Sequence, residues 1–246
     1  MLSKIITKII SLLKKILPLQ KTLNHKFLNK NQVTNLEIVI NSLKNRGYQP
    51  TNIIDVGCFE GLWTKQVISI YDNSYYYLFD ADNTNSAILD KLIKIHPKVK
   101  YKIKLLSNIV KEYDFYKMKS GSSIFEENTS FSRECIQLKS STLAAELDKE
   151  IFKSRDNLIK IDAQGSEINI LKGLGNYINN FEVVILEVSL HEYNKNAPLF
   201  DEVFNYMYSQ EFKLYDIFDL KRHGNNKSFL FQYDCIFIKK NSNLFK

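Results

Sequence analysis

Short apolar runs alternate with amphipathic segments along most of the chain. The apolar runs are rich in β-branched and aromatic residues, which is typical of buried strands. The segments between them carry apolar residues at helical spacing and predict helices. We expect strands at residues 52–56, 75–79, 99–106, 158–162 and 183–188, and helices at residues 36–45, 84–95, 140–147, 168–174 and 199–207, with a further helix beginning near residue 62.

Two late segments predict a different kind of strand pair. Residues 212–218 and 229–238 alternate apolar and polar positions, and a turn at residues 224–226 lies between them. Such strands are expected to be antiparallel neighbours. Elsewhere strands and helices alternate, which predicts an α/β fold with a mostly parallel sheet and helices on both faces. Residues 113–136 lack a regular pattern and are expected to form a loop, with a turn at residues 121–123.

Residues 1–17 separate apolar from polar positions around a helical wheel, and Pro18 ends the pattern. Lysines recur through the segment, so no uninterrupted apolar stretch could cross a bilayer, and the pattern of a signal peptide is missing. A basic amphipathic helix suits an anionic membrane surface. It suits packing on the domain or on a second copy equally well, because periodicity cannot separate these. We therefore divide the chain into a helix and linker at residues 1–35 and a single domain at residues 36–246.

The composition indicates which kinds of binding partner and which cellular compartment to expect. The net charge is +7, and the hydrophobic content of 44% is ample for a packed core. The charge comes from scattered lysines rather than from clustered arginines and aromatics, so a nucleic-acid partner is not expected. Cys58, Cys135 and Cys235 lack C-x-x-C spacing, which favours a reducing compartment and argues against disulfides or a zinc site. We expect a cytoplasmic protein, peripheral at the inner membrane surface if its N-terminal segment binds lipid.

Residues 52–61 are the strongest candidate for a cofactor site. Their sequence, Asn-Ile-Ile-Asp-Val-Gly-Cys-Phe-Glu-Gly, predicts a buried strand, a turn with Gly57 and Gly61, and then a helix. The glycines let the backbone approach a ligand, and the helix begins with unpaired N–H groups. Such a unit commonly holds a nucleotide. The dinucleotide fingerprint G-x-G-x-x-G is absent, and Asp55 would repel a pyrophosphate but not an amino or sulfonium group.

Acids also follow the second and fourth predicted strands. Asp80 is placed to accept hydrogen bonds from ribose hydroxyls, and Asp82 could do the same or could cap the next helix. Ser107 and Asn108 follow the third strand, where a loop that contacts adenine would lie. Asp162 ends the fourth strand. Because the carboxyl ends of parallel strands form the ligand-binding edge, and because buried carboxylates are costly unless paired, these acids indicate a cofactor site.

Two stretches resemble the FkbM-type methyltransferases. One is residues 52–61, whose arrangement is similar to the first motif of class I S-adenosylmethionine-dependent methyltransferases. The other is residues 159–173, which contain Lys-Ile-Asp-Ala-Gln-Gly-Ser-Glu. This run is similar to the family signature Lys-Ile-Asp-x-Glu-Gly-x-Glu, with Gln164 in place of the usual Glu. The resemblance covers residues 52–239 and leaves out the N-terminal helix.

The resemblance implies a class I methyltransferase fold, a Rossmann-like three-layer sandwich. Its mostly parallel seven-stranded sheet would have one antiparallel strand near an edge. The resemblance also implies S-adenosyl-L-methionine as the cofactor and a hydroxyl acceptor on a sugar, a glycan or a glycosylated metabolite. The expected cofactor-binding residues are Asp55, Gly57, Cys58, Phe59, Glu60, Gly61, Asp80, Ala81, Ser107 and Asp162.

Methyl transfer needs an aligned acceptor and a group that takes its proton. The candidates for this catalytic role are Asp162, Glu187 and His191. Asp162 could instead hold the methionine part of the cofactor, and His191 could be an ordinary surface residue. The same three residues could ligate a metal, but nothing in their spacing demands one, and we expect no metal site.

Other functions stay open on the sequence alone. A nicotinamide-dependent oxidoreductase would use the same sheet, although the missing G-x-G-x-x-G counts against it. A non-catalytic module would keep the cofactor pocket, and a membrane adaptor would depend on residues 1–18. The loops that contact the acceptor are expected at residues 113–136 and 190–198.

Overall fold

A computed structural model describes residues 34–129 and 132–246. The amphipathic helix expected at residues 1–17 lies outside the described residues, and so does the linker expected at residues 20–35 except for its last two residues, Thr34 and Asn35, the second of which begins α2. The described part begins with α2 (Asn35–Asn45), which starts in a capping box: the side chains of Thr34 and Glu37 each accept the other's backbone N–H. Within this part, no helix is both long enough and apolar enough to cross a membrane.

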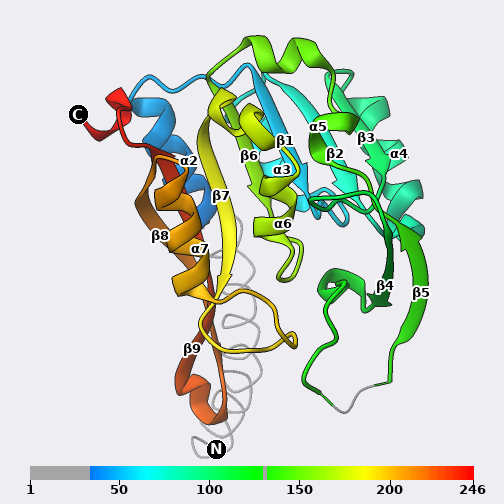
Figure 1. The fold of residues 1–246 in the computed structure, drawn as a ribbon. Helices are drawn as coiled ribbons and strands as arrows, with labels where there is room; N and C mark the ends of the chain where they lie inside the picture. The colour runs from blue at the N-terminus through cyan, green and yellow to red at the C-terminus, as the bar shows by residue number, and fades with distance from the viewer. Residues whose placement is uncertain (1–33, 130–131) are drawn as a thin grey trace, which may run out of the picture.

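Within the described residues, seven strands form the main sheet in the order β3-β2-β1-β6-β7-β9-β8 (Figure 1). Pairing is parallel from β3 to β7, and β9 is antiparallel to both of its neighbours. One antiparallel strand therefore lies next to the edge strand β8. The strands are β1 (Asn52–Val56), β2 (Tyr75–Asp80), β3 (Val99–Ile103), β6 (Asn157–Ile161), β7 (Phe181–Ser189), β8 (Phe212–His223) and β9 (Phe229–Lys239).

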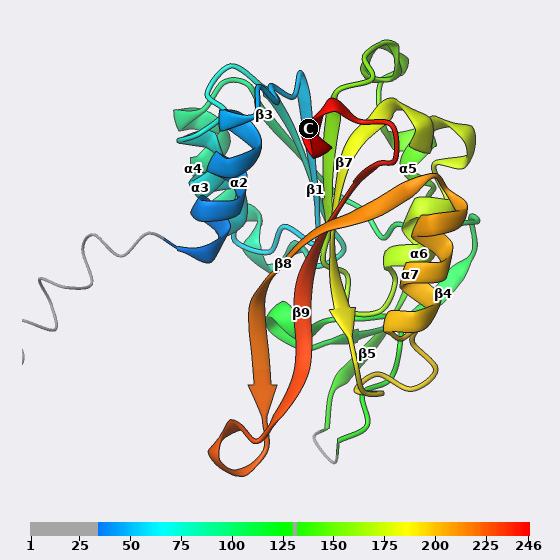
Figure 2. The same cartoon turned by 90° about the vertical axis from the view of Figure 1, so that its left-hand side faces the viewer.

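Helices cover both faces of the sheet, as the view along its plane in Figure 2 shows. The helices α2, α3 (Leu62–Ile68) and α4 (Ser86–Ile95) pack on one face, and α5 (Leu143–Glu146), α6 (Glu167–Lys172) and α7 (Phe200–Ser209) pack on the other. Successive strand residues point to opposite faces. Ile53 of β1 thus joins the core under the first group of helices, and Ile54 joins the core under the second. Short 3₁₀ turns complete the chain: η1 (Asn83–Asn85), η2 (Lys119–Gly121), η3 (Lys149–Lys153), η4 (Gly175–Asn180), η5 (Asn225–Lys227) and η6 (Asn243–Phe245).

This architecture confirms the predicted fold class, including the mostly parallel sheet and the antiparallel pairing of the two late strands. Three local predictions differ from the structure. The third strand ends at Ile103, the helix expected at residues 140–147 is the single turn α5, and the β8–β9 hairpin is longer than the apolar alternation suggested. The residues that lengthen β8 are mostly exposed and, apart from Leu220, polar, so burial gave no signal for them.

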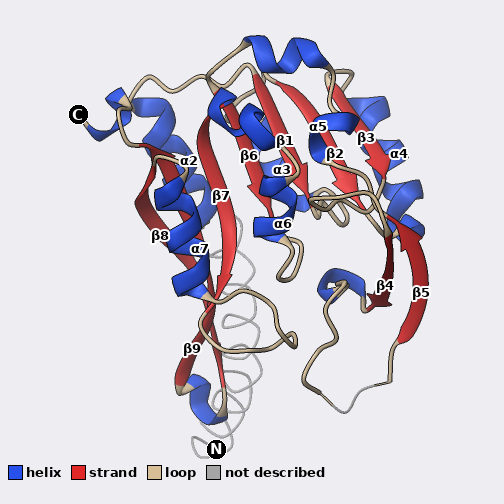
Figure 3. Ribbon diagram, viewed as in Figure 1, coloured by secondary structure: helices blue, strands red, loops and turns tan. Residues whose placement is uncertain are grey.

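The segment expected to be an irregular loop contains a two-stranded antiparallel ribbon. Its strands are β4 (Glu112–Lys117) and β5 (Glu134–Lys139). The residues of both strands are exposed or partly buried, except for Phe115 of β4, which is buried. In Figure 3 the arrowheads of the parallel strands end at one edge of the sheet, and the ribbon, the loop after β7 and the β8–β9 hairpin extend beyond that edge. These three segments therefore surround the edge at which α/β sheets bind ligands.

Candidate active site

The turn after β1 lies very close to the loop after β6. Gly57 has a φ of +71°, and a Cβ at this position would lie 1.8 Å from the carbonyl oxygen of Asp162. The N–H groups of Gly57 and Cys58 donate to the carbonyl oxygen of Phe79, at 2.9 and 3.1 Å. Because other residues avoid this backbone conformation and would clash here, glycine at position 57 sets how closely the ends of β1 and β6 approach.

Asp80 and Asp82 have different surroundings. The Oδ2 atom of Asp80 accepts the N–H of Phe59 at 2.7 Å, and its Oδ1 atom accepts the N–H of Asp82 at 2.9 Å. Burial raises the pKa of Asp80, although both N–H donors act against this shift. The Asp82 side chain instead accepts the N–H of Thr84 and caps η1. Asp80 is therefore the one of these two acids that stays available to a ligand.

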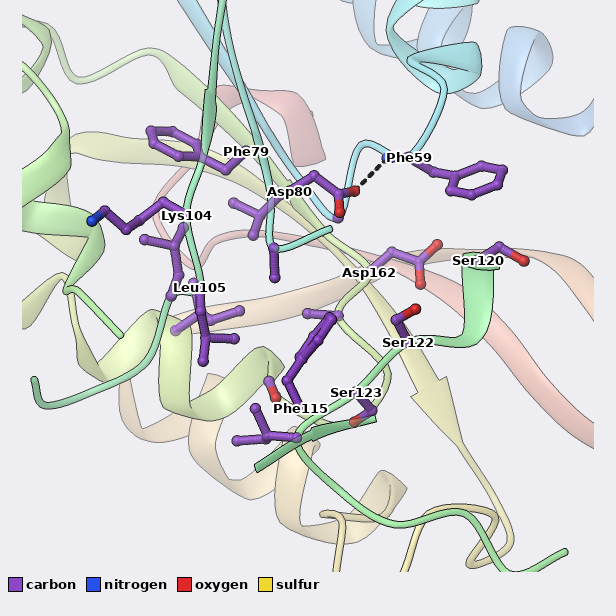
Figure 4. A pocket seen from close by; sticks show the side chains of 18 of the residues that line it. Phe59, Phe79, Asp80, Lys104, Leu105, Phe115, Ser120, Ser122, Ser123 and Asp162 are labelled. Carbon is purple, nitrogen blue, oxygen red and sulfur yellow. Dashed lines mark hydrogen bonds between the residues drawn. The ribbon is translucent and has the colours of Figure 1, made fainter. Parts of the chain in front are cut away.

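A cavity lies beside Asp80, at the carboxyl ends of β1, β2 and β6. Figure 4 shows Leu105 and Phe115 on one side of it and Asp162 and Ser120 on the other. The cavity thus offers apolar walls for a flat ring, an acid at β2 for hydroxyl groups, and an acid at β6 for a positive group. Among the residues expected to bind the cofactor, its lining includes Gly57, Phe59, Asp80, Ala81 and Asp162.

Asp55 is not among the residues that line this cavity. Its carboxylate is fully buried, accepts the hydroxyl of Thr64 at 2.6 Å and lies 3.2 Å from the Lys160 ammonium. Lys160 also donates to the carbonyl oxygen of Gly57 at 3.1 Å and lies 3.7 Å from the Asp162 carboxylate. A buried carboxylate needs such partners. Asp55 therefore holds Lys160, and Lys160 in turn holds the backbone of the turn at Gly57.

Cys58, Glu60, Gly61 and Ser107 were expected at the cofactor, and they also lie outside the lining of this cavity. Cys58 belongs to the core under α3, and Gly61 faces leucines of α4. Ser107 is fully buried, with its hydroxyl 2.8 Å from that of Tyr113. Only part of the turn after β1 therefore lines this cavity.

A side-chain amide joins the acids of two neighbouring strands. The Nε2 atom of Gln164 donates to Asp162 Oδ1 at 2.9 Å and to Glu187 Oε2 at 2.8 Å. The backbone of Gln164 has a φ of +50°. Its carbonyl oxygen accepts hydrogen bonds from the Ser123 hydroxyl and the Asn194 amide, at 2.8 and 2.9 Å. Loops from both sides of the site therefore fix Gln164 between the two acids.

Glu187 faces a second cavity, of about 300 Å³. Ser120 lines both cavities, which therefore adjoin at η2. The rings of Tyr193 and Phe231 meet edge to face, with 5.2 Å between their centroids. The second cavity combines aromatic surfaces with hydrogen-bonding groups, and its lining is Ser120, Gly121, Gln164, Glu187, Tyr193, Lys221, His223, Phe231 and Gln232.

The carboxylate of Glu187 is held by three side chains. The Lys221 ammonium contacts Oε1, and Gln232 joins Gln164 in donating to Oε2, at 3.2 Å. Burial and, after it, the Asp162 carboxylate raise the pKa of Glu187 to about 8, whereas Lys221 lowers it. An acid whose pKa lies near neutral pH can both take and release a proton.

His191 does not line either cavity. It is exposed, and its ring packs edge-on against Phe229, with 5.3 Å between the centroids. Over residues 34–129 and 132–246, no three histidine, cysteine, aspartate or glutamate side chains are grouped so that they could hold a metal ion.

Two residues of the site were absent from the sequence-based candidates. Lys221 and Gln232 face each other across the β8–β9 pair. The alternating pattern predicts a strand around Gln232, but it does not reveal the acid that this side chain will meet. Gln164 was noticed only as a departure from a family signature. Its position between two acids became visible only in the folded structure.

Comparison with known proteins gives a family match over most of the chain. A family model described as the methyltransferase FkbM domain matches residues 24–214. Among curated proteins, none matches the chain.

The chain is also similar to solved structures. One is the methyltransferase FkbM from Methylobacillus flagellatus, with 13% identity, a TM-score of 0.48, and coverage of 77% of this chain and 43% of that one. Another is M. capricolum TrmK in complex with S-adenosyl-homocysteine, with 13% identity, a TM-score of 0.45, and coverage of 82% and 68%. A third is precorrin-6y C5,15-methyltransferase from Geobacter metallireducens, with 9% identity, a TM-score of 0.45, and coverage of 85% and 92%. The chain thus spans less than half the length of the Methylobacillus structure.

Proposed function

Because the chain belongs to the FkbM methyltransferase family, we propose that it transfers the methyl group of S-adenosylmethionine to a hydroxyl oxygen of a sugar, a glycan or a glycosylated metabolite. Membership of the family confirms the resemblance drawn from the two sequence motifs. It also makes S-adenosylmethionine the cofactor.

The first cavity fits this cofactor chemically. Asp80 presents a carboxylate that can accept the ribose hydroxyls, and it is held in place by the Phe59 and Asp82 N–H groups. The apolar side chains of Leu105 and Phe115 suit the adenine ring. The carboxylate of Asp162 has 31% of its surface exposed and suits the positively charged methionine end. When bound, the cofactor supplies an activated methyl group whose bond to sulfur breaks as the new bond to oxygen forms.

One observation carries the proposal: Glu187 lies in the second cavity and is joined through Gln164 to Asp162 in the first. A hydroxyl that attacks a methyl group must lose its proton. Glu187 is the group that we assign to take it, because its pKa of about 8 lets it accept a proton near neutral pH. Asp162 is assigned to the cofactor side, and His191 has no assigned part.

The second cavity also supports a sugar acceptor. Sugars combine hydroxyl groups with apolar C–H faces, so they need both hydrogen-bonding side chains and aromatic surfaces. Gln232 and Lys221 supply the first kind of contact, and Tyr193 and Phe231 supply the second.

Two measurements test the proposal in sequence. Calorimetric titration of the full chain with S-adenosylmethionine and S-adenosylhomocysteine tests the cofactor. Methyl transfer from labelled S-adenosylmethionine to a panel of simple glycosides and to a glycan pool tests the acceptor. Glu187→Gln should abolish transfer and keep cofactor binding. If the folded chain bound neither cofactor form, the methyltransferase assignment would fail. Binding without transfer, even in wild type, would favour the non-catalytic module.

We also propose that the segment before the domain places the enzyme at an anionic membrane surface. The support is the sequence of residues 1–17, with lysines along one side of an apolar helical pattern. Sedimentation with anionic vesicles, compared between the full chain and a chain that lacks residues 1–17, tests this. Equal sedimentation of the two would contradict it.

A further inference from the structure

Lys221 reaches the site because the edge strand β8 is irregular. The register of β8 against β9 shifts on both sides of this residue, between Phe218 and Lys221 and between Lys221 and Arg222. Bulges of this kind turn a side chain away from the regular alternation. Here the shift directs the ammonium of Lys221 to Glu187 on β7, although β9 lies between the two strands.

The carboxylate that Lys221 meets is deeply enclosed. The side chain of Glu187 is 2% exposed, whereas that of Lys221 is 48% exposed. Gln164 and Gln232 donate to Oε2 of Glu187, so Oε1 is the oxygen that depends on Lys221. Without the lysine, the two remaining partners would be neutral amides. A buried carboxylate without a cation is costly and tends to take up a proton.

The other charged groups around Glu187 do not replace Lys221. Asp162 and Glu167 both favour the protonated form of Glu187. Asp234, directly opposite Glu187 on β9, adds a further acid to the cluster. The ammonium of Lys160 lies with Asp55 and Asp162 at the end of β6. Tyr193 and His223 line the same cavity.

We infer that Lys221 is a positioning residue for methyl transfer, which favours the ionised form of Glu187 and orients its Oε1 side in the second cavity. The β8–β9 hairpin thereby sets the pH range in which the acceptor can lose its proton. The inference rests on the proposed function for its catalytic meaning. The proton passes from the acceptor hydroxyl to Glu187, the acceptor oxygen forms the bond to the methyl carbon, and the electron pair of the broken bond stays on sulfur. Lys221 keeps its own proton throughout.

The test measures Glu187 directly and needs neither cofactor nor acceptor. The full chain is labelled with ¹³C at the glutamate side-chain carboxyl carbon, and Glu187→Gln identifies the resonance of Glu187. Its pH titration is then compared between wild type, Lys221→Met and Lys221→Arg. Lys227→Met, an exposed lysine of the same hairpin, is the matched control.

We expect Lys221→Met to move the midpoint of the Glu187 titration upward by about one pH unit, since the lost cation is adjacent but half-exposed. Lys221→Arg should restore most of the wild-type midpoint, and Lys227→Met should leave it unchanged. A midpoint that stays in place or falls in a folded Lys221→Met chain would overturn the inference. A failure of cofactor binding in wild type would instead count against the proposed function, because this titration does not depend on it.

Once an acceptor is found, the same variants give a second readout. The rise of the transfer rate with pH should shift upward in Lys221→Met by the amount seen in the titration, and Lys221→Arg should restore it. A lower rate with an unshifted pH profile would show that Lys221 has only a structural role.

Discussion

Replacing Asp80 by alanine should weaken cofactor binding strongly. The substitution removes the carboxylate that lies in the cavity wall and leaves the N–H of Phe59 without its partner at 2.7 Å. Hydrogen bonds to a charged acceptor contribute about 1.5–3 kcal/mol. The loss of that contribution for the ribose hydroxyls should weaken the affinity for S-adenosylhomocysteine by a factor of roughly 10 to 150.

Asp82→Ala provides the matched control, because Asp82 lies two residues away and points its side chain into a cap. Its carboxylate accepts the N–H of Thr84 and does not line the cavity. Losing such a cap costs about 1 kcal/mol of stability. Asp82→Ala should therefore lower the melting temperature by a few degrees and leave the affinity nearly unchanged.

Calorimetry on the two variants and wild type, at one pH and one salt concentration, separates these effects. Near-UV circular dichroism shows whether each variant keeps its packing. If Asp80→Ala bound S-adenosylhomocysteine within a factor of three of wild type, the assignment of the cofactor to this cavity would be refuted. Equal weakening by both variants would show that the effect comes from the loop and not from the carboxylate.

Three further perturbations have definite expected outcomes. Gly57→Ala should abolish binding of S-adenosylhomocysteine, because the new Cβ would lie 1.8 Å from a backbone carbonyl oxygen. Gly175→Ala is the control, because Gly175 also has a positive φ but has open space around it. Calorimetry on both variants measures the affinity for S-adenosylhomocysteine. Burial raises the pKa of Glu167 to about 7, so the folded chain binds a proton more tightly than the unfolded chain, and stability should fall by about 3 kcal/mol as pH rises from about 4.5 through 7. Urea unfolding at several pH values should show a smaller fall in Glu167→Gln, and an equal fall would contradict this. Gln164→Glu should raise the midpoint of the Glu187 titration by about one pH unit, because the amide donor is replaced by a third carboxyl group beside Asp162 and Glu187. An unchanged midpoint would mean that the amide does not influence Glu187.

The elements around the first cavity were predictable because they are built from contiguous sequence. A strand, a glycine turn and a helix are local patterns, and Asp80 is the last residue of its strand. Even here the pattern could not show which side chains near the turn face the cavity and which face the core. Asp55 carries the acid expected from the motif, yet its side chain is buried with Thr64 and Lys160 and does not line the cavity. The motif reports the spacing of residues, and packing decides which of them meet the ligand.

In the second cavity the sequence pointed to Glu187 but not to its partners, for a different reason. The residues come from separate segments: Glu187 lies on β7, Gln232 lies on β9, and Lys221 lies on β8 at a register shift. The ribbon of β4 and β5 escaped detection because only Phe115 among its residues is buried, and apolar periodicity signals burial. A bulge in an edge strand leaves no pattern of its own, so the sequence gives no reason to bring Lys221 to Glu187.

The departure at position 164 shows how the two halves are joined. Asp162 and Glu187 are both acids, and two carboxylates can share a site only when donors or cations lie between them. The amide of Gln164 donates one hydrogen bond to each, at 2.9 and 2.8 Å. An ionised glutamate at this position would offer acceptors alone, and the cluster would then need an extra proton or another cation. In this chain the amide supplies the donors and Lys221 supplies the cation. The amide at position 164 therefore supports the proposed role of Glu187 as a base beside Asp162.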